Sequence, residues 1–280
     1  MIAYLNGQFL PKAEARVSAD DRGFLFADGA YEVVRVYGGR IFQAAEHWMR
    51  LERSLRELRM SVPAGLSFPA VAEVLIEKNG LGQGDATIYL QVTRGAAPRL
   101  HTFPDASTPP TVYAFAAPFT AQPQKMTAGA RVTMTPDQRW SRCDIKSISL
   151  LPNILAAQLA KERGAEEAIL VRDGLVTEGS KTNFAAVYDG QLVTHPQNNH
   201  ILGGITLNVI LRLCRELNIR VKESGIIATE LKAADEAMLF GTTAEVMPVV
   251  QVDDWKVGDG KPGPVTRRLQ EAFRAAVARG

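Results

Sequence analysis

The stretch "RCDIKSISLLPNILAAQL", residues 142–159, places a lysine inside a mostly apolar run. If its first half forms a strand, the two-residue period puts Lys146 on the same face as Ile148 and Leu150. Burying an unpaired ammonium group costs several kcal/mol, unless the group gives up its proton. Two interpretations stay open at this point. The ammonium reaches solvent past an apolar stem, or the side chain is a desolvated amine that acts as a nucleophile.

The composition is that of an ordinary globular protein. The 280 residues correspond to one large domain or two smaller ones, at roughly 150 residues per domain. The 32 Lys and Arg residues against 30 Asp and Glu give a formal net charge of +2 without a basic stripe, which argues against nucleic-acid binding. No apolar run reaches the about 18 residues of a membrane-spanning helix.

The first residues and the cysteines bear on the compartment. The start, "MIAYLNGQFLPK", lacks the basic and then apolar layout of a signal peptide and instead predicts a hairpin around Asn6 and Gly7. Only Cys143 and Cys214 are present, so neither a disulfide framework nor a cysteine-rich metal site is expected. We expect a cytoplasmic protein.

Strands and helices are expected in both halves, which indicates an α+β protein with two domains. The alternation of apolar residues and the turn glycines predict strands within 4–10, 32–42, 86–95, 110–119, 130–136, 167–171, 175–179, 183–196, 220–226, 236–243 and 246–257. Helical spacing predicts helices over 47–58, 69–81, 153–163, 206–217 and 264–278. The aperiodic stretch near 118–126 divides the chain into an N-terminal domain over 1–119, a linker over 120–126 and a C-terminal domain over 127–280.

Two small-residue turns are candidates for binding a phosphate group. In "ILGGITLNVILRLCREL", two glycines and Thr206 precede an apolar helix, so backbone N–H groups and a hydroxyl meet at a helix N-terminus. The stretch "LFGTTAEV" offers a similar turn at Thr242 and Thr243, and Arg50 in "EHWMRL" is a candidate cationic anchor. Taken singly, the first turn is also compatible with an ordinary helix cap, and most helical arginines are merely solvated.

A carboxylate completes the pattern. Glu178 in "LVTEGSKTNF" stands at the end of an expected strand, where an acidic residue usually serves the turn. If it faced a pyridine nitrogen, it would keep that nitrogen protonated and make the ring an electron sink. A lysine, two turns that together form a phosphate cup, and a carboxylate in one chain indicate pyridoxal 5′-phosphate as the cofactor.

These motifs resemble the fold-type IV pyridoxal-phosphate enzymes, a family of D-amino acid aminotransferases, branched-chain aminotransferases and aminodeoxychorismate lyases. The resemblance runs through nearly the whole chain, and several long motifs in the expected order are a specific signal. They are "ADGAYEVVRVY", "EHWMRL", "RWSRCDIKSISLLPN", "EEAILVRDGLVTEGSKTNF", "ILGGIT" and "TTAEVMPV". The resemblance implies an α+β fold with a smaller α/β N-terminal domain and a larger C-terminal pseudo-barrel domain that carries the cofactor lysine.

The resemblance also implies a role for individual residues around the cofactor. Lys146 corresponds to the lysine that forms the internal aldimine and transfers the proton, so it would not be a bare buried cation. Glu178 matches the acid that faces the pyridine nitrogen. The remaining cofactor-binding positions are at the phosphate, and they are Arg50, Ile205, Thr206, Thr242 and Thr243.

A loop distinguishes the members of this family from one another. In the D-amino acid aminotransferases, an Arg-x-His pair and a tyrosine near the N-terminus hold the substrate carboxylate. In "VTRGAAPRLHTFP" the matching positions are Arg99 and His101, and the tyrosine is Tyr31. A guanidinium can hold a carboxylate bidentately, while imidazole and phenol add directed hydrogen bonds. The resemblance further implies a homodimer in which this loop reaches over the site of the other subunit.

Two positions depart from the family pattern. Leu207 stands directly after the threonine of the phosphate cup, where many members carry an arginine. Lys181 follows Ser180 at a position where small residues are common. We expect both departures to affect cofactor affinity and substrate range rather than the type of reaction.

The resemblance is closest to the D-amino acid aminotransferases. It implies a ping-pong transamination through a Lys146 aldimine, from a D-amino acid such as D-alanine to a 2-oxo acid such as 2-oxoglutarate or pyruvate. Three alternatives share the fold: a branched-chain L-amino acid aminotransferase, an (R)-amine transaminase and an aminodeoxychorismate lyase. A catalytically inactive binding protein is an alternative from another class.

Overall fold

The computed structural model describes residues 1–279, which form two compact units. Unit 1 consists of Met1–Thr120 together with the short segment Ile145–Ser149, which includes Lys146. Unit 2 consists of Ala121–Asp144 and the residues from Leu150 on. Across the described residues, no helix has the length and apolar character needed to cross a membrane.

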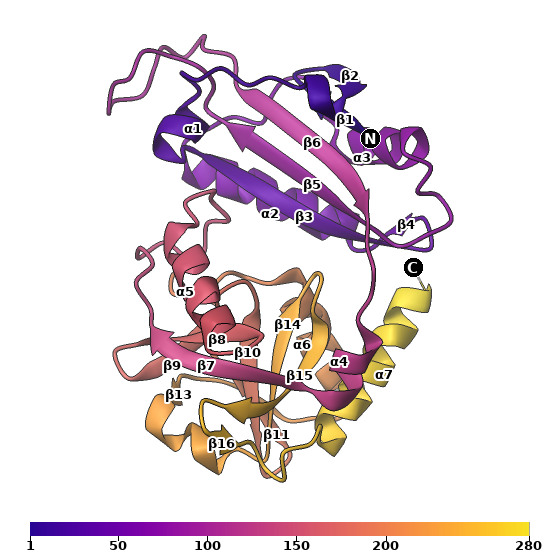
Figure 1. Ribbon diagram of the computed structural model, residues 1–280, viewed down its shortest axis with the longest axis vertical. Coiled ribbons are helices and arrows are strands. Elements are labelled where there is room, and N and C mark those ends of the chain that lie inside the picture. The colour runs from indigo at the N-terminus through magenta and orange to yellow at the C-terminus, as the bar shows by residue number, and fades with distance from the viewer. Residues whose placement is uncertain (280) are drawn as a thin grey trace. The chain divides into compact units, whose positions relative to one another are not determined.

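Unit 1 is an antiparallel sheet with two long helices packed against it (Figure 1). Its strands lie in the order β2-β1-β6-β5-β3-β4. The bounds of its elements are β1 (Ile2–Leu5), β2 (Gln8–Pro11), a 3-10 helix (Lys12–Glu14), α1 (Arg22–Phe26), β3 (Gly29–Tyr37), β4 (Arg40–Ile41), α2 (Ala44–Glu57), α3 (Phe68–Lys78), β5 (Ala86–Thr93) and β6 (Thr111–Pro118).

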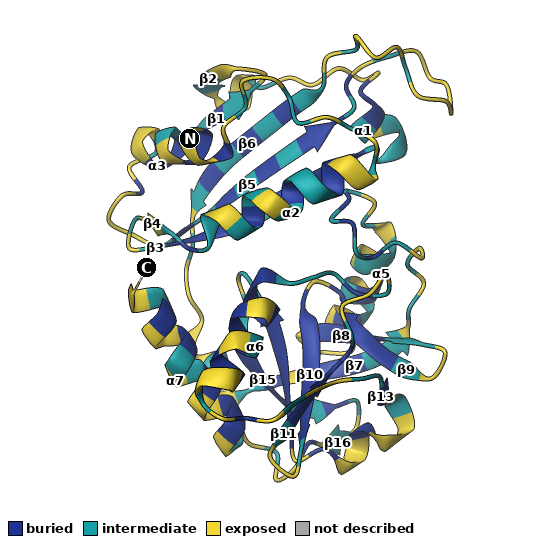
Figure 2. Ribbon diagram, turned by 180° about the vertical axis from the view of Figure 1, so that it is seen from behind, coloured by how far each residue is buried: buried dark blue, intermediate teal, exposed yellow. Residues whose placement is uncertain are grey.

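The core of unit 1 lies between this sheet and the helices. Leu51 and Leu55 of α2 and Leu75 of α3 pack with Val34 and Ile88 of the sheet, and α2 shows alternating buried and exposed residues along its length in Figure 2. The predicted hairpin at Asn6 and Gly7 is confirmed. Both residues have positive φ, as the two central positions of a type I′ turn require.

Unit 2 is built around a ten-stranded mixed sheet. The strand order is β12-β11-β10-β14-β15-β7-β8-β9-β13, and β16 pairs with β15. The strands are β7 (Ala130–Pro136), β8 (Glu167–Arg172), β9 (Leu175–Gly179), β10 (Asn183–Tyr188), β11 (Gln191–Thr194), β12 (Val221–Glu223), β13 (Ile226–Ile227), β14 (Glu236–Gly241), β15 (Glu245–Val252) and β16 (Trp255–Lys256).

This sheet curls back on itself. Strands β9 and β10 stand near opposite ends of the strand order, yet the N–H of Gly179 on β9 donates to the carbonyl of Thr182, next to β10, at 2.7 Å. The turn between them is tied to β8, where the buried Glu167 accepts from the N–H of Lys181 at 2.8 Å and from the Thr182 hydroxyl at 2.9 Å. The predicted pseudo-barrel is thus confirmed, and its closure positions the end of β9.

The helices of unit 2 pack on this sheet, and one of them was not expected. They are α4 (Pro123–Ala128), α5 (Leu151–Glu162), α6 (Ile205–Glu216), a 3-10 helix (Ala228–Ala233) and α7 (Pro264–Arg279). Helix α4 lies in the stretch interpreted as an irregular linker. A residue far along the chain contacts this helix: the Gln270 side chain donates to the carbonyl of Met126 at 2.9 Å.

The first half of the lysine segment, residues 142–150, does not form the strand considered from the sequence. The structure describes every residue of this segment. Its only strand-like pairing is an isolated bridge between Ser147 and Ala30 of β3. Buried and less buried residues do alternate here, but the buried face is the one opposite Lys146. Cys143, Ile145 and Ser147 are buried, and Lys146 is only partly buried. Long-range hydrogen bonds of the backbone fix this conformation, since the N–H of Tyr31 donates to the Lys146 carbonyl at 3.1 Å.

Candidate active site

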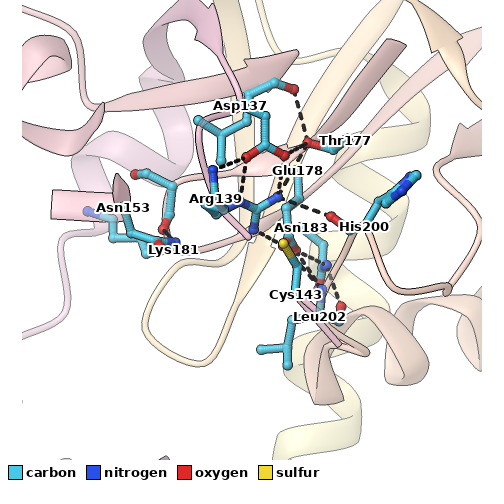
Figure 3. Close-up of polar contacts among 12 residues, drawn as sticks. Asp137, Arg139, Cys143, Asn153, Thr177, Glu178, Lys181, Asn183, His200 and Leu202 are labelled. Carbon is cyan, nitrogen blue, oxygen red and sulfur yellow. Dashed lines mark hydrogen bonds and ion pairs between the residues drawn. The ribbon is translucent and has the colours of Figure 1, made fainter. Parts of the chain in front are cut away.

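In unit 2, the side chain of Glu178 at the end of β9 lies in a buried polar cluster (Figure 3). Nη1 of Arg139 donates to Oε1 of Glu178, and Nδ2 of Asn183 donates to Oε2 at 2.9 Å. The N–H of Leu202 lies 3.1 and 3.2 Å from the two carboxylate oxygens. Burial raises the pKa of Glu178 to about 7, although the charge of Arg139 and the hydrogen bonds from Arg139 and Leu202 act in the opposite direction. The charge of this carboxyl group therefore depends on its neighbours.

Arg139 is itself held by a second carboxylate. Asp137, whose side chain is 0% exposed, accepts from Arg139 Nε and Nη2, both at 2.9 Å. Nη2 also donates to the carbonyl of His200 at 3.1 Å, and Arg172 pairs with Asp137 at 3.2 Å. Burial alone would lower the pKa of Arg139, but the hydrogen bond to Asp137 and the charge of Glu178 raise it overall. The charges alternate along Glu178, Arg139, Asp137 and Arg172, and Arg139 stays a cation.

A helix N-terminus lies beside this cluster. Helix α6 begins at Ile205, and its N-cap Gly204 supplies no side chain to the first-turn amides. A Cβ atom at Gly204 would overlap Oδ1 of Asn183, so a residue with a side chain does not fit there. The amides of Ile205 and Thr206 have no partner within the helix, and the dipole of this 12-residue helix favours an anion.

The second predicted turn joins β14 and β15. It follows Phe240, which pairs with Asn183 across the sheet, and it closes at the Gly241–Glu245 pair. Thr242 is partly buried and Thr243 is exposed. The turn and the start of α6 therefore both adjoin β10, as the predicted phosphate cup requires.

In unit 1, Lys146 lies against Tyr31 and helix α2. The N–H of Lys146 donates to the Ser54 hydroxyl at 3.2 Å, and Nζ lies 4.3 Å from the centre of the Tyr31 ring. The amine therefore contacts an aromatic face. This contact brings two of the predicted site residues together.

Arg50 is one turn before Ser54 on α2, and its guanidinium pairs with Glu32 of β3. Nε donates to Oε1 at 2.7 Å and Nη2 donates to Oε2 at 2.8 Å. Nδ1 of His47 also contacts Oε2, at 2.8 Å. Burial by itself raises the pKa of Glu32, but the charge and hydrogen bonds of Arg50 and the contact with His47 lower it to about 2. Glu32 is thus a permanent anion that orients Arg50.

Arg99 and His101 lie on the loop that follows β5. Both pack on the Phe26 ring of α1, with the Arg99 guanidinium carbon 5.1 Å and the His101 ring 5.6 Å from its centre. Arg22 donates through Nη1 to the Leu100 carbonyl at 2.7 Å and through Nε to Asp28 at 2.8 Å. Helix α1, which the sequence did not indicate, thus supports the loop between its two predicted substrate-binding residues.

The predicted residues fall into two groups, each within one unit. Unit 1 holds Tyr31, Arg50, Arg99, His101 and Lys146, and unit 2 holds Glu178, Ile205, Thr206, Thr242 and Thr243. The sequence interpretation missed their polar partners. For Glu32 a signal existed, because in "YEVVRVY" it shares a strand face with the buried Val34 and Val36. Nothing local links Arg139 or Asn183 to Glu178, because Glu178 lies on β9 and is brought to them by the fold.

Comparisons with known proteins identify the family. Residues 29–252 match the model of the family described as amino-transferase class IV. The chain is 43% identical to the D-alanine aminotransferase of Staphylococcus haemolyticus over 277 residues, 98% of this chain and 97% of that protein. The chain belongs to the class IV aminotransferases. The D-alanine aminotransferase of Bacillus licheniformis is 39% identical to this aminotransferase over 278 residues, covering 99% and 97% of the two chains.

Solved structures of class IV aminotransferases share the fold. The Escherichia coli branched-chain amino acid aminotransferase superposes with a TM-score of 0.90 at 29% identity, covering 98% of this chain and 93% of that one. The T.th. branched-chain amino acid aminotransferase with pyridoxamine 5′-phosphate gives a TM-score of 0.87 at 28% identity, covering 100% and 95%. The predicted fold-type IV architecture is confirmed.

The residues of this aminotransferase fit the cofactor of the class, pyridoxal 5′-phosphate. An uncapped helix N-terminus with a glycine at its N-cap suits a phosphate, and a buried carboxyl group with a pKa of about 7 suits a ring nitrogen. Among the described residues, no group of three or more His, Cys, Asp or Glu side chains could hold a metal ion.

Proposed function

We propose that this chain is a D-amino acid aminotransferase, which moves the amino group of a D-amino acid such as D-alanine to a 2-oxo acid such as 2-oxoglutarate or pyruvate. The observation that carries the proposal is the 43% identity to a D-alanine aminotransferase over 98% of this chain. The solved branched-chain relatives are less similar in sequence, at 29% and 28% identity.

The bound cofactor supplies an aldehyde for the substrate amine and a pyridine ring that accepts the electron pair left when the α-proton is removed. Lys146 would carry that proton on Nζ, which lies 4.3 Å from the centre of the Tyr31 ring. Glu178 holds a proton at the ring nitrogen.

The phosphate is bound by residues of both predicted turns. The amides of Ile205 and Thr206 at the N-terminus of α6 would donate to the phosphate, and the Thr206, Thr242 and Thr243 hydroxyls would add hydrogen bonds. Arg50 contributes a positive charge, and Glu32 fixes its guanidinium through two hydrogen bonds. With an aliphatic side chain at Leu207, the amides and hydroxyls supply the remaining contacts.

Specificity for D-amino acids is proposed to come from three residues that hold the substrate carboxylate. Arg99 offers two parallel N–H donors, and His101 and Tyr31 add single hydrogen bonds. A donor without a carboxylate gains nothing from these groups, which separates this function from that of an amine transaminase.

A donor panel tests the substrate assignment. The purified enzyme with its cofactor is assayed with D- and L-alanine, D- and L-glutamate, L-leucine and a simple chiral arylalkylamine, with 2-oxoglutarate or pyruvate as acceptor. D-Alanine and D-glutamate are expected to exceed their L-isomers by about 100-fold or more in kcat/KM, the order of discrimination that a site with directed hydrogen bonds to the substrate gives. Preference for L-leucine would indicate a branched-chain enzyme, and turnover of the arylalkylamine would indicate an amine transaminase. Multiple-turnover release of pyruvate from aminodeoxychorismate without an acceptor would indicate a lyase.

Peptide mapping tests the role of Lys146. Borohydride reduction of the enzyme with its cofactor, followed by digestion and mass analysis, is expected to place the cofactor on Lys146. A tag on another lysine, such as the exposed Lys161 of α5, would contradict the assignment. Lys146→Ala is expected to lose activity by about 1000-fold or more, as removal of a catalytic group does. A colourless protein that binds no cofactor would favour the inactive binding protein.

The proposed assembly is a homodimer. Leu151, Ile154 and Leu155 of α5 are 66%, 60% and 56% exposed and share one helix face, and adjacent exposed apolar side chains favour association. Sedimentation equilibrium is expected to give twice the mass of the chain. The proposed compartment is the cytoplasm, because both cysteines are free, and cell fractionation tests it.

A further inference from the structure

Within the part of the chain that the structure describes, Glu178 has one cationic partner, and that partner is more extensively bonded to another carboxylate. We propose that Arg139 is a positioning residue that keeps Glu178 ionised, so that the proton between this carboxylate and the cofactor's ring nitrogen stays on the nitrogen. The inference rests on the proposed function of Glu178 and assigns to Arg139 a part in setting the electron-withdrawing power of the ring.

The first step concerns the charge of Glu178. The residue is 4% exposed, and among the described residues its carboxylate contacts, besides Arg139, the neutral Asn183 amide and Leu202 N–H. Burial favours the protonated form of a carboxyl group, and neutral donors offset this only in part. The negative charge of Asp137 acts in the same direction as burial. Arg139 is therefore the main group that favours the carboxylate.

The second step concerns the orientation of Arg139. Nε and Nη2 are bound by Asp137, and Nη2 also meets the His200 carbonyl, so Nη1 is left to point at Glu178 (Figure 3). Arg172 pairs with Asp137 and donates to the Arg139 carbonyl at 2.9 Å. The nearby Cys143 thiol is neutral, because burial raises its pKa. The guanidinium is thus locked before any ligand binds.

The third step concerns the proton. A carboxylate beside a protonated ring nitrogen and a carboxylic acid beside a neutral one contain the same atoms and one proton. They differ only in whether the proton is bonded to nitrogen or to Oε of Glu178. A fixed cation next to the carboxylate stabilises the first arrangement. A protonated ring nitrogen is the stronger electron sink.

The test uses the enzyme loaded with a cofactor that carries ¹⁵N at the ring nitrogen, because the ¹⁵N chemical shift reports directly on protonation of that atom. The wild type, Arg139→Gln, Arg139→Lys and the matched control Arg142→Gln are compared at neutral pH. Arg142 lies in the same segment, but its guanidinium pairs with Asp144, at 2.9 Å. The wild type and R142Q are expected to show a protonated nitrogen. R139Q is expected to move most of the way to a neutral pyridine, and R139K, which keeps a charge, less far.

A double-mutant cycle on cofactor affinity separates this role from a structural one. R139Q is expected to weaken cofactor binding about tenfold in the wild type and little in an E178Q background, because the effect passes through Glu178. The kcat for D-alanine is expected to fall about tenfold in R139Q, with its KM nearly unchanged.

The outcomes are distinguishable. A protonated nitrogen in R139Q, or equal loss of cofactor affinity in both backgrounds, would overturn the role of Arg139 and leave the proposed function intact. A neutral nitrogen in the wild type would overturn the proposed role of Glu178, and the role of Arg139 with it.

Discussion

Two buried glutamates, one in each unit, have opposite ionisation behaviour. Glu32 on β3 is 1% exposed and its pKa is lowered to about 2, whereas Glu178 on β9 is 4% exposed and its pKa is raised to about 7. Burial raises the pKa of both carboxyl groups. The difference therefore comes from their partners.

Glu32 receives two hydrogen bonds from one guanidinium and a third from an imidazole, whereas Glu178 shares its guanidinium with Asp137. The comparison shows that the hydrogen bonds a guanidinium commits to a carboxylate, rather than the depth of that carboxylate in the protein, decide its ionisation. A permanent anion is suited to orient Arg50, while a group poised near neutral pH is suited to share a proton with a cofactor.

The largest expected effect is on stability. Glu32→Gln is expected to lower the free energy of unfolding of the cofactor-free chain by about 3 kcal/mol, because it removes the buried anion that the partly buried Arg50 guanidinium pairs with. Glu178→Gln at about pH 8 is expected to leave stability unchanged or to raise it, because Arg139 keeps Asp137. Urea unfolding followed by circular dichroism measures both values.

The control for these variants is Glu73→Gln, at an exposed position of α3, with an expected change within about 0.5 kcal/mol. Equal destabilisation by E32Q and E178Q would contradict the idea that charged partners stabilise the Glu32 carboxylate more than the Glu178 carboxylate.

The pH dependence of stability separates the two glutamates next. Because the folded pKa of Glu178 is about 7, above the ordinary glutamate value of 4.5, the folded chain binds this proton more tightly than the unfolded chain. The contribution of Glu178 to stability therefore falls as pH rises from 4.5 to about 7. The stability of the wild type relative to E178Q is expected to drop by about 3 kcal/mol between about pH 5 and about pH 8.

Glu32 has the opposite sign. Its folded pKa of about 2 lies below 4.5, so its stabilisation is complete above 4.5 and is lost as pH falls through about 2. The difference in stability between the wild type and E32Q is expected to be constant over the range in which that of E178Q changes. If the stability difference from the wild type changed with pH in the same way for E32Q and E178Q, the partners of the two glutamates would not control their ionisation.

A smaller effect is expected at His47, the second partner of Glu32. His47→Leu removes the contact at 2.8 Å and is expected to cost about 2 kcal/mol of stability, typical of a hydrogen bond to a charged group. His47→Asn places an amide nitrogen near the position of Nδ1 and is the matched control, with an expected loss of less than about 1 kcal/mol. If both variants lose the same amount, the imidazole contributes by packing rather than by its hydrogen bond.

The smallest expected effect concerns a neutral donor of Glu178. Gly204→Ala inserts a Cβ atom where Oδ1 of Asn183 lies and is expected to displace the Asn183 amide from Glu178. Cofactor affinity is expected to fall about tenfold, or about 1.4 kcal/mol. Equilibrium dialysis with pyridoxal 5′-phosphate measures the change. Gly84→Ala, at a glycine with open space around it and no positive φ, controls for the substitution itself, and equal losses in the two variants would exclude a role for Asn183.

Much of the fold was predictable because it depends on neighbours in the chain. The turn at Asn6 and Gly7, the apolar faces of α2 and α6, and the alternation in β5 and β6 follow from periods and turn chemistry. Cofactor motifs in the expected order also identified the family. Helix α4 escaped prediction because its sequence has no period and its contact with Gln270 comes from the far end of the chain.

The sequence alone determined the family and proposed the lysine, the glutamate and the two phosphate turns, because each is a local pattern of residue types. Only the tertiary structure decided that Lys146 lies beside Tyr31, that Arg50 pairs with Glu32, and that Arg139 stands between Glu178 and Asp137. A strand period tells which face a side chain occupies, but not which charge faces it. That charge is set by packing between segments far apart in the chain, and it decides whether a buried carboxyl group keeps its proton.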